Sequence, residues 1–151
     1  MAKIDILIDY TDNFAACPLN EDIACISTGK TLDEVKTNIV SALGFHRDGL
    51  IEDGLDLPEE LQGDILPVFH LSTRAQLKYT DRYITRKALA RETGIAEQQL
   101  SHYANGLRHP RPAMQKRIAD GIRTISQRLL LVSIRTSTSV SLYKCGVTLP
   151  H

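Results

Sequence analysis

The chain has 151 residues, of which 42% are hydrophobic and 24% are charged. Both values lie close to the average of soluble globular proteins, which excludes a disordered chain and a membrane protein as the expected class. The formal net charge of zero conceals two opposite halves, because residues 1–71 carry 4 Lys/Arg and 14 Asp/Glu whereas residues 72–151 carry 14 and 4. An acidic half repels phosphates, while a basic half gains affinity for nucleic acid by releasing counterions. The two halves are therefore expected to bind different kinds of partner.

Neither the first residues nor the cysteines indicate secretion or a metal site. The opening MAKIDILIDY has a short apolar run interrupted by Asp5 and Asp9, which suits neither a signal peptide nor a membrane span. Cys17, Cys25 and Cys145 are an odd number without a CxxC pair, so reduced thiols are expected rather than a disulfide framework or a zinc site. We expect a cytoplasmic protein without membrane, metal or cofactor.

Three strands are predicted at the start of the chain. Strict alternation over residues 3–9 predicts a half-buried strand, and turn signals separate it from two shorter strands over residues 14–17 and 23–27. The inward-facing residues of the first strand are expected to be Ile4, Ile6 and Ile8.

A helix and a fourth strand follow. The segment Thr31-Leu-Asp-Glu34 has the spacing of a capping box, so a helix is predicted to begin there and to end near Gly49 or Gly54. Its apolar stripe is Leu32, Val35, Ile39 and Leu43. Residues 65–69 predict one more strand, placed at a sheet edge because Pro67 cannot donate to a ladder.

Two domains and a tail are predicted. The charge changes sign just after the fourth strand, and Ser72 can cap a new helix, so we place one domain at residues 1–71 and an all-helical one at residues 72–132. Residues 133–151 are Ser/Thr-rich and are expected to form a tail whose structure the pattern leaves open, disorder included.

The most specific pattern is a pair of short helices. Residues 85–94 predict a helix that begins at a capping threonine and ends at Gly94, and residues 97–106 predict a second helix after a tight turn. The residues that bracket the turn are Ala90, Ile95 and Leu100. The pair resembles the Cro/repressor type of helix-turn-helix, in which the second helix is presented to a major groove. The resemblance rests on the order Leu-Ala-x-x-Thr-Gly-Ile followed by Leu-Ser-x-Tyr-x-Asn-Gly.

Candidate DNA contacts follow from this geometry. Side chains expected to reach base edges are Glu97, Gln98, Gln99 and His102. Side chains expected to touch phosphates are Arg86, Lys87, Arg108, His109 and Arg111. Gln98 is the strongest candidate because glutamine can pair bidentately with adenine. The alternative is an ordinary helical domain with a solvated basic surface.

One closing helix is predicted after the pair. Its helical stripe is Ile118, Ile122, Ile125 and Leu129. This stripe is expected to pack under the pair, with a second copy of the chain as the alternative partner. Because one helix-turn-helix covers one half-site, we expect a homodimer or a homotetramer.

Over about residues 1–130 the chain resembles the HicB antitoxin family of bacterial toxin–antitoxin systems. Residues 83–95 and 99–112 resemble the helix-turn-helix of that family, and the strands, the Thr31-Leu-Asp-Glu-Val35 segment and Leu57-Pro58 are similar to its first domain. The glycine-rich hairpin of many members is replaced here by Cys17-Pro-Leu-Asn-Glu-Asp22. The expected fold is thus α+β, a β-β-β-α-β partial ribonuclease-H-like domain followed by an all-α helix-turn-helix domain.

The resemblance implies an antitoxin of a type II toxin–antitoxin system. Its N-terminal domain would bind and silence a HicA-type toxin, a small basic mRNA-cleaving ribonuclease, and its C-terminal domain would bind operator DNA and repress its own operon. The acidic first half suits a basic partner. An exposed acidic hairpin carrying one aromatic anchor suggests Asp12, Phe14, Glu21 and Asp22 as toxin contacts, against the alternative that they are ordinary turn residues.

Two other functions would use parts of the same sequence. A transcriptional repressor whose N-terminal domain senses a ligand, or only dimerises, shares the same DNA-binding half. A metal-dependent enzyme could use Asp5 and Asp9, but further acidic ligands are needed, and Asp33 or Glu34 are better explained as a helix start. We therefore expect no catalytic activity.

Overall fold

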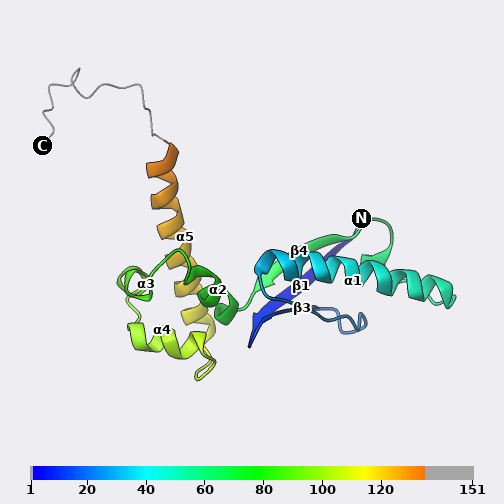
Figure 1. The fold of residues 1–151 in the computed structure, drawn as a ribbon, viewed down its shortest axis with the longest axis horizontal. Coiled ribbons are helices and arrows are strands. Elements are labelled where there is room, and N and C mark those ends of the chain that lie inside the picture. Colours follow the sequence, from blue (N-terminus) through cyan, green and yellow to red (C-terminus); the bar gives the residue numbers. More distant parts are fainter. Residues whose placement is uncertain (1, 135–151) are drawn as a thin grey trace, which may run out of the picture.

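Residues 2–134 are described by a computed structural model, in which a sheet half and a helical half follow one another along the chain (Figure 1). The strands are β1 (Lys3–Tyr10), β2 (Phe14–Pro18), β3 (Ser27–Gly29) and β4 (Leu66–Leu71). They form one sheet in the order β3-β2-β1-β4, with β4 parallel to β1 and the other neighbours antiparallel. The predicted edge position of the Pro67 strand is confirmed.

The prediction for the third strand was wrong in its position. The apolar run from Ile23 to Ile26 forms turns instead, with the Ile23 N–H donating to Asn20 and the Cys25 N–H to Ile23, and pairing with β2 begins only at Ser27. Ile23 is buried without joining the ladder, while Ile26 is 75% exposed. An apolar residue can thus reach the core from a turn, which alternation alone does not reveal.

Helix α1 (Leu32–Glu52) begins at the predicted capping box. The Glu34 N–H donates to Thr31 Oγ1 at 3.1 Å, and the Glu34 carboxylate accepts from the Lys30 N–H at 3.1 Å, one residue before the usual partner. After Glu52 the chain turns at Gly54, whose φ of +68° is costly for other residues. A single turn, η1 (Glu59–Leu61), leads back to β4.

One face of the sheet is covered by α1, and the first core lies between them (Figure 1). Its central side chains are Ile4, Ile6, Ile8, Val35, Ile39 and Leu43, all 1% exposed or less. Burying each such side chain stabilises the fold by roughly 1.5–3 kcal/mol. Both predicted apolar stripes are therefore confirmed.

The helical half contains α2 (Thr73–Thr80), α3 (Arg86–Thr93), α4 (Glu97–Ala104) and α5 (Pro112–Ile134). Its separate core is built from Leu77, Leu89, Ile95, Leu100, Tyr103, Ala104 and Ile118. Ser72 caps α2 as predicted, since its hydroxyl accepts from the Ala75 N–H at 3.1 Å. The buried residues thus fall into two clusters, while the domain boundary at residue 71 stays a prediction.

The inward stripe of α5 ends one turn earlier than predicted. Ile118 is buried and Ile122 and Ile125 pack against the helical core, but Leu129 is 59% exposed. The reason is geometric: near the ion pair of Arg128 with Glu92, α5 leaves the helical body and continues away from it (Figure 1). The predicted tail lies outside the described residues, apart from positions 133 and 134, which extend α5.

Candidate nucleic-acid interface

Helix α3 is defined by local hydrogen bonds at both ends. The Ala88 N–H donates to Thr85 Oγ1 at 3.0 Å, and Gly94 ends the helix with φ +70°. The buried Thr93 hydroxyl donates to the Leu89 carbonyl at 2.8 Å and accepts from the Ile95 N–H at 3.2 Å. These bonds fix the tight turn that leads into α4.

The C-termini of α3 and α4 are each held by an arginine from another helix. Arg117 of α5 donates to the Thr93 carbonyl at 2.6 Å, and Arg74 of α2 donates to the Ala104 carbonyl at 3.3 Å. A cation at a helix C-terminus interacts favourably with the free carbonyls and the helix dipole. Gly106, which follows α4, has a φ of +72°, a conformation that strains other residues, and it lies close to the Arg74 guanidinium. Helices α2 and α5 thus fix the orientation of α3 and α4.

Arg86 has a structural position rather than an open one. Its guanidinium donates twice to the Asp81 carboxylate, at 2.9 and 2.7 Å, and to Ser101 Oγ at 3.1 Å. The side chain is 18% exposed. Arg86 therefore ties the start of α3 to α4, and the expectation that it is a free phosphate contact does not agree with these bonds.

Helix α4 turns a polar face to solvent. Leu100, Tyr103 and Ala104 are buried, whereas Glu97 and Gln98 are exposed and His102 is half-exposed. Gln99 differs from its neighbour, because its Nε2 donates to the Tyr103 hydroxyl at 2.7 Å. Of the two adjacent glutamines, the structure leaves Gln98 available to a ligand.

Most acidic side chains of the helical half are already paired. Asp81 binds Arg86, Glu92 binds Arg128 at 2.6 Å, and Asp120 binds Lys116 at 2.6 Å. Glu97 forms no ion pair within residues 2–134. The one unpaired acid therefore lies on the exposed start of α4, where it can accept from a base amino group.

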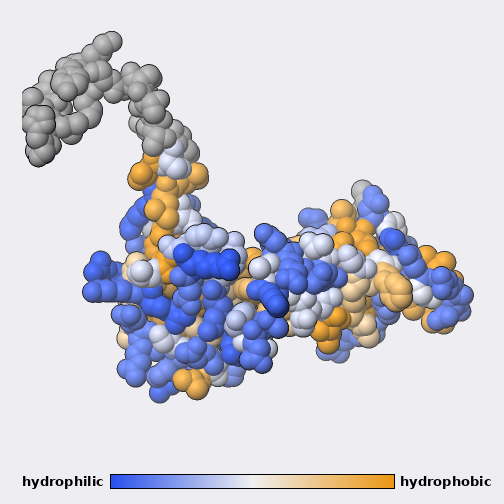
Figure 2. Space-filling model, viewed as in Figure 1, coloured by the Kyte–Doolittle hydropathy of each residue, from blue (hydrophilic) through white to orange (hydrophobic). Residues whose placement is uncertain are grey.

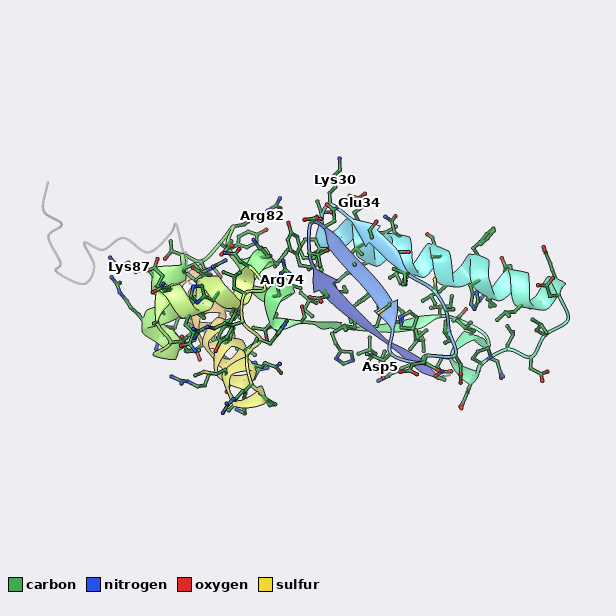
Figure 3. All side chains as sticks on the ribbon, turned by 90° about the horizontal axis from the view of Figure 1, so that it is seen from below. Asp5, Lys30, Glu34, Arg74, Arg82 and Lys87 are labelled. Carbon is green, nitrogen blue, oxygen red and sulfur yellow. The ribbon has the colours of Figure 1, made fainter. Side chains whose placement is uncertain are left out.

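The cations of this half divide into bound and free ones. Within residues 2–134, the free cations form no hydrogen bond or ion pair through their side chains; they are Arg82, Lys87, Arg91, Arg108 and Arg111. Lys87 and Arg91 are four residues apart, so they share one face of α3, and Figure 3 shows Lys87 extending away from the helical half. Lys87, Arg108 and Arg111 were predicted from the sequence, whereas Arg82 and Arg91 were missed.

A protein-family model described as Helix-turn-helix, of the Cro/C1 type, matches residues 74–126. This segment begins in α2, contains the α3–α4 pair and ends in α5. Residues 74–126 are a DNA-binding helix-turn-helix. No curated protein and no solved structure matches the chain significantly. The chain is thus a DNA-binding transcription regulator, and residues 1–73 lie outside the matched segment.

Outside the helix-turn-helix, the predicted toxin contacts do not form one surface. Phe14 is 6% exposed and packs edge-on against Tyr10, with ring centroids 5.0 Å apart, so the expectation of an exposed aromatic anchor was wrong. Phe14 points into the core because alternation along β2 places it with Ala16. Asp12, Glu21 and Asp22 are exposed, but the five residues of β2 separate the first from the other two by about 17 Å.

A more suitable surface lies on α1. A groove of about 450 Å³ runs between residues 24–26 and α1 and is lined by Ile26, Phe45, Leu50 and Asp53 among others. Phe45 is 84% exposed, and Figure 2 shows hydrophobic surface at this far end of the sheet half. The following residues 48–64 hold seven Asp/Glu and no Lys/Arg. That acidic run, with Phe45 lying off the apolar stripe of α1, was the sequence signal that could have found this surface.

The acidic residues of β1 bind protein groups. Asp5 Oδ1 lies 2.7 Å from His70 Nε2, and Asp9 accepts from the Ser72 hydroxyl at 2.5 Å. Over residues 2–134, no group of three His, Cys, Asp or Glu side chains comes together as a metal site. In the same part of the chain, no helix is long and apolar enough to cross a membrane.

Proposed function

We propose that this chain represses transcription by placing α4 in the major groove of an operator, and that its acidic half binds a small basic toxin. The observation that carries the proposal is the separation of charge: free cations surround α3 and α4, while the sheet half carries a net charge of −10. The helix-turn-helix explains the first partner, and the acidic half needs a second one of opposite charge.

The DNA contacts sort into two kinds. Gln98 and Glu97 offer direct readout at the start of α4, and His102 lies one turn further along the same helix. Lys87, Arg108 and Arg111 supply charge at the start of α3 and after α4, where they position the helix on phosphates. We assign Gln99 and Arg86 to holding the motif together.

The operator test uses the two adjacent glutamines as a matched pair. Fluorescence anisotropy with DNA from upstream of the chain's own gene should show Gln98→Ala weakening specific binding about 10- to 100-fold while non-specific binding is kept. Gln99→Ala should weaken both equally, through loss of its bond to Tyr103. If Gln98→Ala weakens specific and non-specific DNA binding by the same factor, as is expected for Gln99→Ala, the assignment of Gln98 to base readout is contradicted.

A second copy is proposed to cover the end of α5. Leu129, Leu130, Leu131 and Val132 are all more than half exposed, which is unusual for consecutive apolar residues of a monomer. Figure 2 shows this apolar surface beyond the helical body. Two copies joined there would present two recognition helices to a two-fold symmetric operator. Light scattering should give a dimer that Leu130→Glu converts to monomer; a monomeric wild type would indicate that another segment covers α5.

The toxin proposal rests on the resemblance to HicB antitoxins and on the groove beside Phe45. The β-β-β-α-β order agrees with the partial ribonuclease-H-like fold that the resemblance implies. A HicA-type toxin must be basic to grip RNA, so an exposed aromatic side chain in a groove that Asp53 also lines, followed by the acidic run of residues 48–64, suits its RNA-binding surface. We therefore assign toxin binding to the groove of α1, by steric cover and without catalysis.

Co-expression with the neighbouring short open reading frame tests this proposal. The neighbour alone should arrest growth, and the wild-type chain should restore growth and co-purify with it. Phe45→Asp should lose both effects, whereas the control Leu107→Asp, at an equally apolar and exposed site of the helical half, should keep them. Expression from an unrelated promoter removes any effect of DNA binding. A neighbour without toxicity leaves a repressor only and overturns the antitoxin function.

A further inference from the structure

A cleft lies where the two halves of the chain meet. Its volume is about 290 Å³, near the lower end of the roughly 300–1,000 Å³ common for small-molecule sites. The sheet half contributes Tyr10, Phe14 and the start of α1, and the helical half contributes the end of α2 and the loop after it. A molecule bound here would touch both halves at once.

Aromatic rings form the walls of this cleft. Tyr10 and Phe14 meet edge to face on one side, and Tyr79 and Tyr83 lie on the other with ring centroids 5.7 Å apart. A hydrogen bond with Tyr83 raises the pKa of Tyr79, so the Tyr79 hydroxyl stays protonated at neutral pH. Rings with such hydroxyls suit a flat, polar ligand.

Cations lie at the rim of the same cleft. Lys78 is already engaged, because its Nζ donates to Asn105 at 3.3 Å and lies 5.6 Å from the centre of the Tyr10 ring. The Lys30 ammonium and the Arg82 guanidinium have no hydrogen bond or ion pair within residues 2–134, and Asp33 is the acid lining the cleft. Figure 3 shows Lys30 and Arg82 on the same side of the junction. Two free cations beside an aromatic cleft indicate an anion that carries a ring.

We propose that this cleft binds a small phosphate ester with a planar ring, of the size of a nucleoside monophosphate. The ring lies among Tyr10, Tyr79 and Tyr83, and the phosphate binds Lys30 and Arg82. Because Lys30 precedes α1 and Arg82 precedes α3, the ligand joins the sheet half to the DNA-binding half. Binding there changes the operator affinity, and the operator changes the ligand affinity by the same factor.

A phosphate of the DNA backbone is the other possible occupant of Lys30 and Arg82. The aromatic lining decides between them, since a backbone phosphate uses cations and leaves the rings without a partner. The site goes beyond the proposed repressor and antitoxin functions, because neither of them requires a small ligand.

The experiment is calorimetric titration of the full-length chain with AMP, GMP, adenosine and inorganic phosphate, in the absence of DNA. At least one nucleotide should bind saturably, with adenosine and phosphate each at least tenfold weaker. Arg82→Ala and Lys30→Ala should each weaken nucleotide binding about tenfold, and Tyr83→Leu should weaken adenosine as well. Lys3→Ala, which removes an exposed cation from the far end of β1, should change nothing.

The outcomes separate this site from the DNA-binding function. No saturable binding of either nucleotide overturns the proposal, as does equal binding by the Arg82→Ala chain. If Arg82→Ala instead weakens operator binding when no nucleotide binds, the two cations are DNA contacts. Where a nucleotide binds, its addition should shift the operator Kd several-fold; an unchanged Kd overturns the coupling. If the wild type and all variants fail to bind the operator, the proposed repressor function is contradicted, while the nucleotide titration, which is done without DNA, still tests the cleft.

Discussion

The sheet half and the helical half treat their charged side chains in opposite ways. Among the described residues of the helical half, 72–134, three of four acids are paired with nearby cations, and five cations have no hydrogen bond or ion pair from their side chains. In the sheet half, residues 48–64 hold seven acids and no Lys/Arg, and of these acids only Asp48 has an ion pair within residues 2–134, with Arg47 just before the run. Apolar residues of α1 are left exposed beside them. The helical half thus offers the free positive charge that DNA binding needs, whereas the sheet half offers negative charge beside exposed apolar side chains.

The basic surface and the acidic surface are assembled in different ways along the chain. The basic surface lies in and beside a compact motif, because its free cations fall within residues 82–111, around α3, the turn and α4. The acidic surface is assembled from residues 24–26 and a helix that ends at Glu52. The following predictions test this contrast, beginning with the largest expected effect.

Two phenylalanines of the sheet half should respond in opposite ways to truncation. Phe14→Ala removes a core side chain and should lower the free energy of unfolding by about 3–5 kcal/mol. Phe45→Ala removes an exposed ring and should change it by less than about 0.5 kcal/mol. Urea unfolding followed by circular dichroism gives both values. A large loss of stability for Phe45→Ala would mean that this ring belongs to the fold.

The features of this chain also differ in how well they could be predicted from the sequence. The helix-turn-helix could be predicted because its caps, turn glycine and apolar contacts lie within a few residues of one another. Phe14 could not be placed, because the face that a short strand buries depends on its register with β1. Leu129 was misplaced because a helical stripe does not reveal where the rest of the core ends. The ion pair of Arg86 was not predicted, although its partner Asp81 lies five residues before it in the sequence, and its role as a phosphate contact stays a prediction.

The two hydrophobic clusters should lose stability separately. Leu100→Ala in the helical core and Ile39→Ala in the sheet core should each cost about 2–5 kcal/mol. Native-state hydrogen exchange should then rise by about two orders of magnitude in the altered half and much less in the other. Equal acceleration in both halves would show one cooperative unit and contradict the boundary at residue 71.

Neighbouring cations of α3 should separate stability from DNA binding. Arg86→Ala removes three hydrogen bonds and should lower the free energy of unfolding by about 1–2 kcal/mol. Lys87→Ala should leave stability unchanged but lower DNA affinity and reduce the salt dependence of binding by about one ion. Urea unfolding and anisotropy at several salt concentrations measure the two effects. If Arg86→Ala reduces the salt slope without loss of stability, Arg86 contacts phosphate after all.

The smallest effect concerns an acid that the helical half neutralises on its surface. A hydrogen bond from Lys116 at 2.6 Å, helped by the charges of Lys116 and Arg123, lowers the pKa of Asp120 against a weaker desolvation effect. A carboxyl whose pKa is lower in the folded chain adds stability above its unfolded pKa, and this stability disappears as the pH falls through the folded pKa. Lys116→Ala should raise the pKa of Asp120 towards its ordinary value.

Titration of the Asp120 carboxyl by NMR checks this shift directly. The melting temperature of the variant should fall slightly below that of the wild type at neutral pH, and this part of the difference should vanish in acid, where Asp120 is protonated in both folded and unfolded chains. Because the pair is exposed, added salt should reduce the difference at neutral pH as well. An unchanged pKa would show that Arg123, 3.6 Å from the carboxylate, neutralises Asp120 without Lys116. The helical half would then keep this acid paired through either of two cations, whereas no Lys or Arg lies among the acids of residues 48–64 in the sheet half.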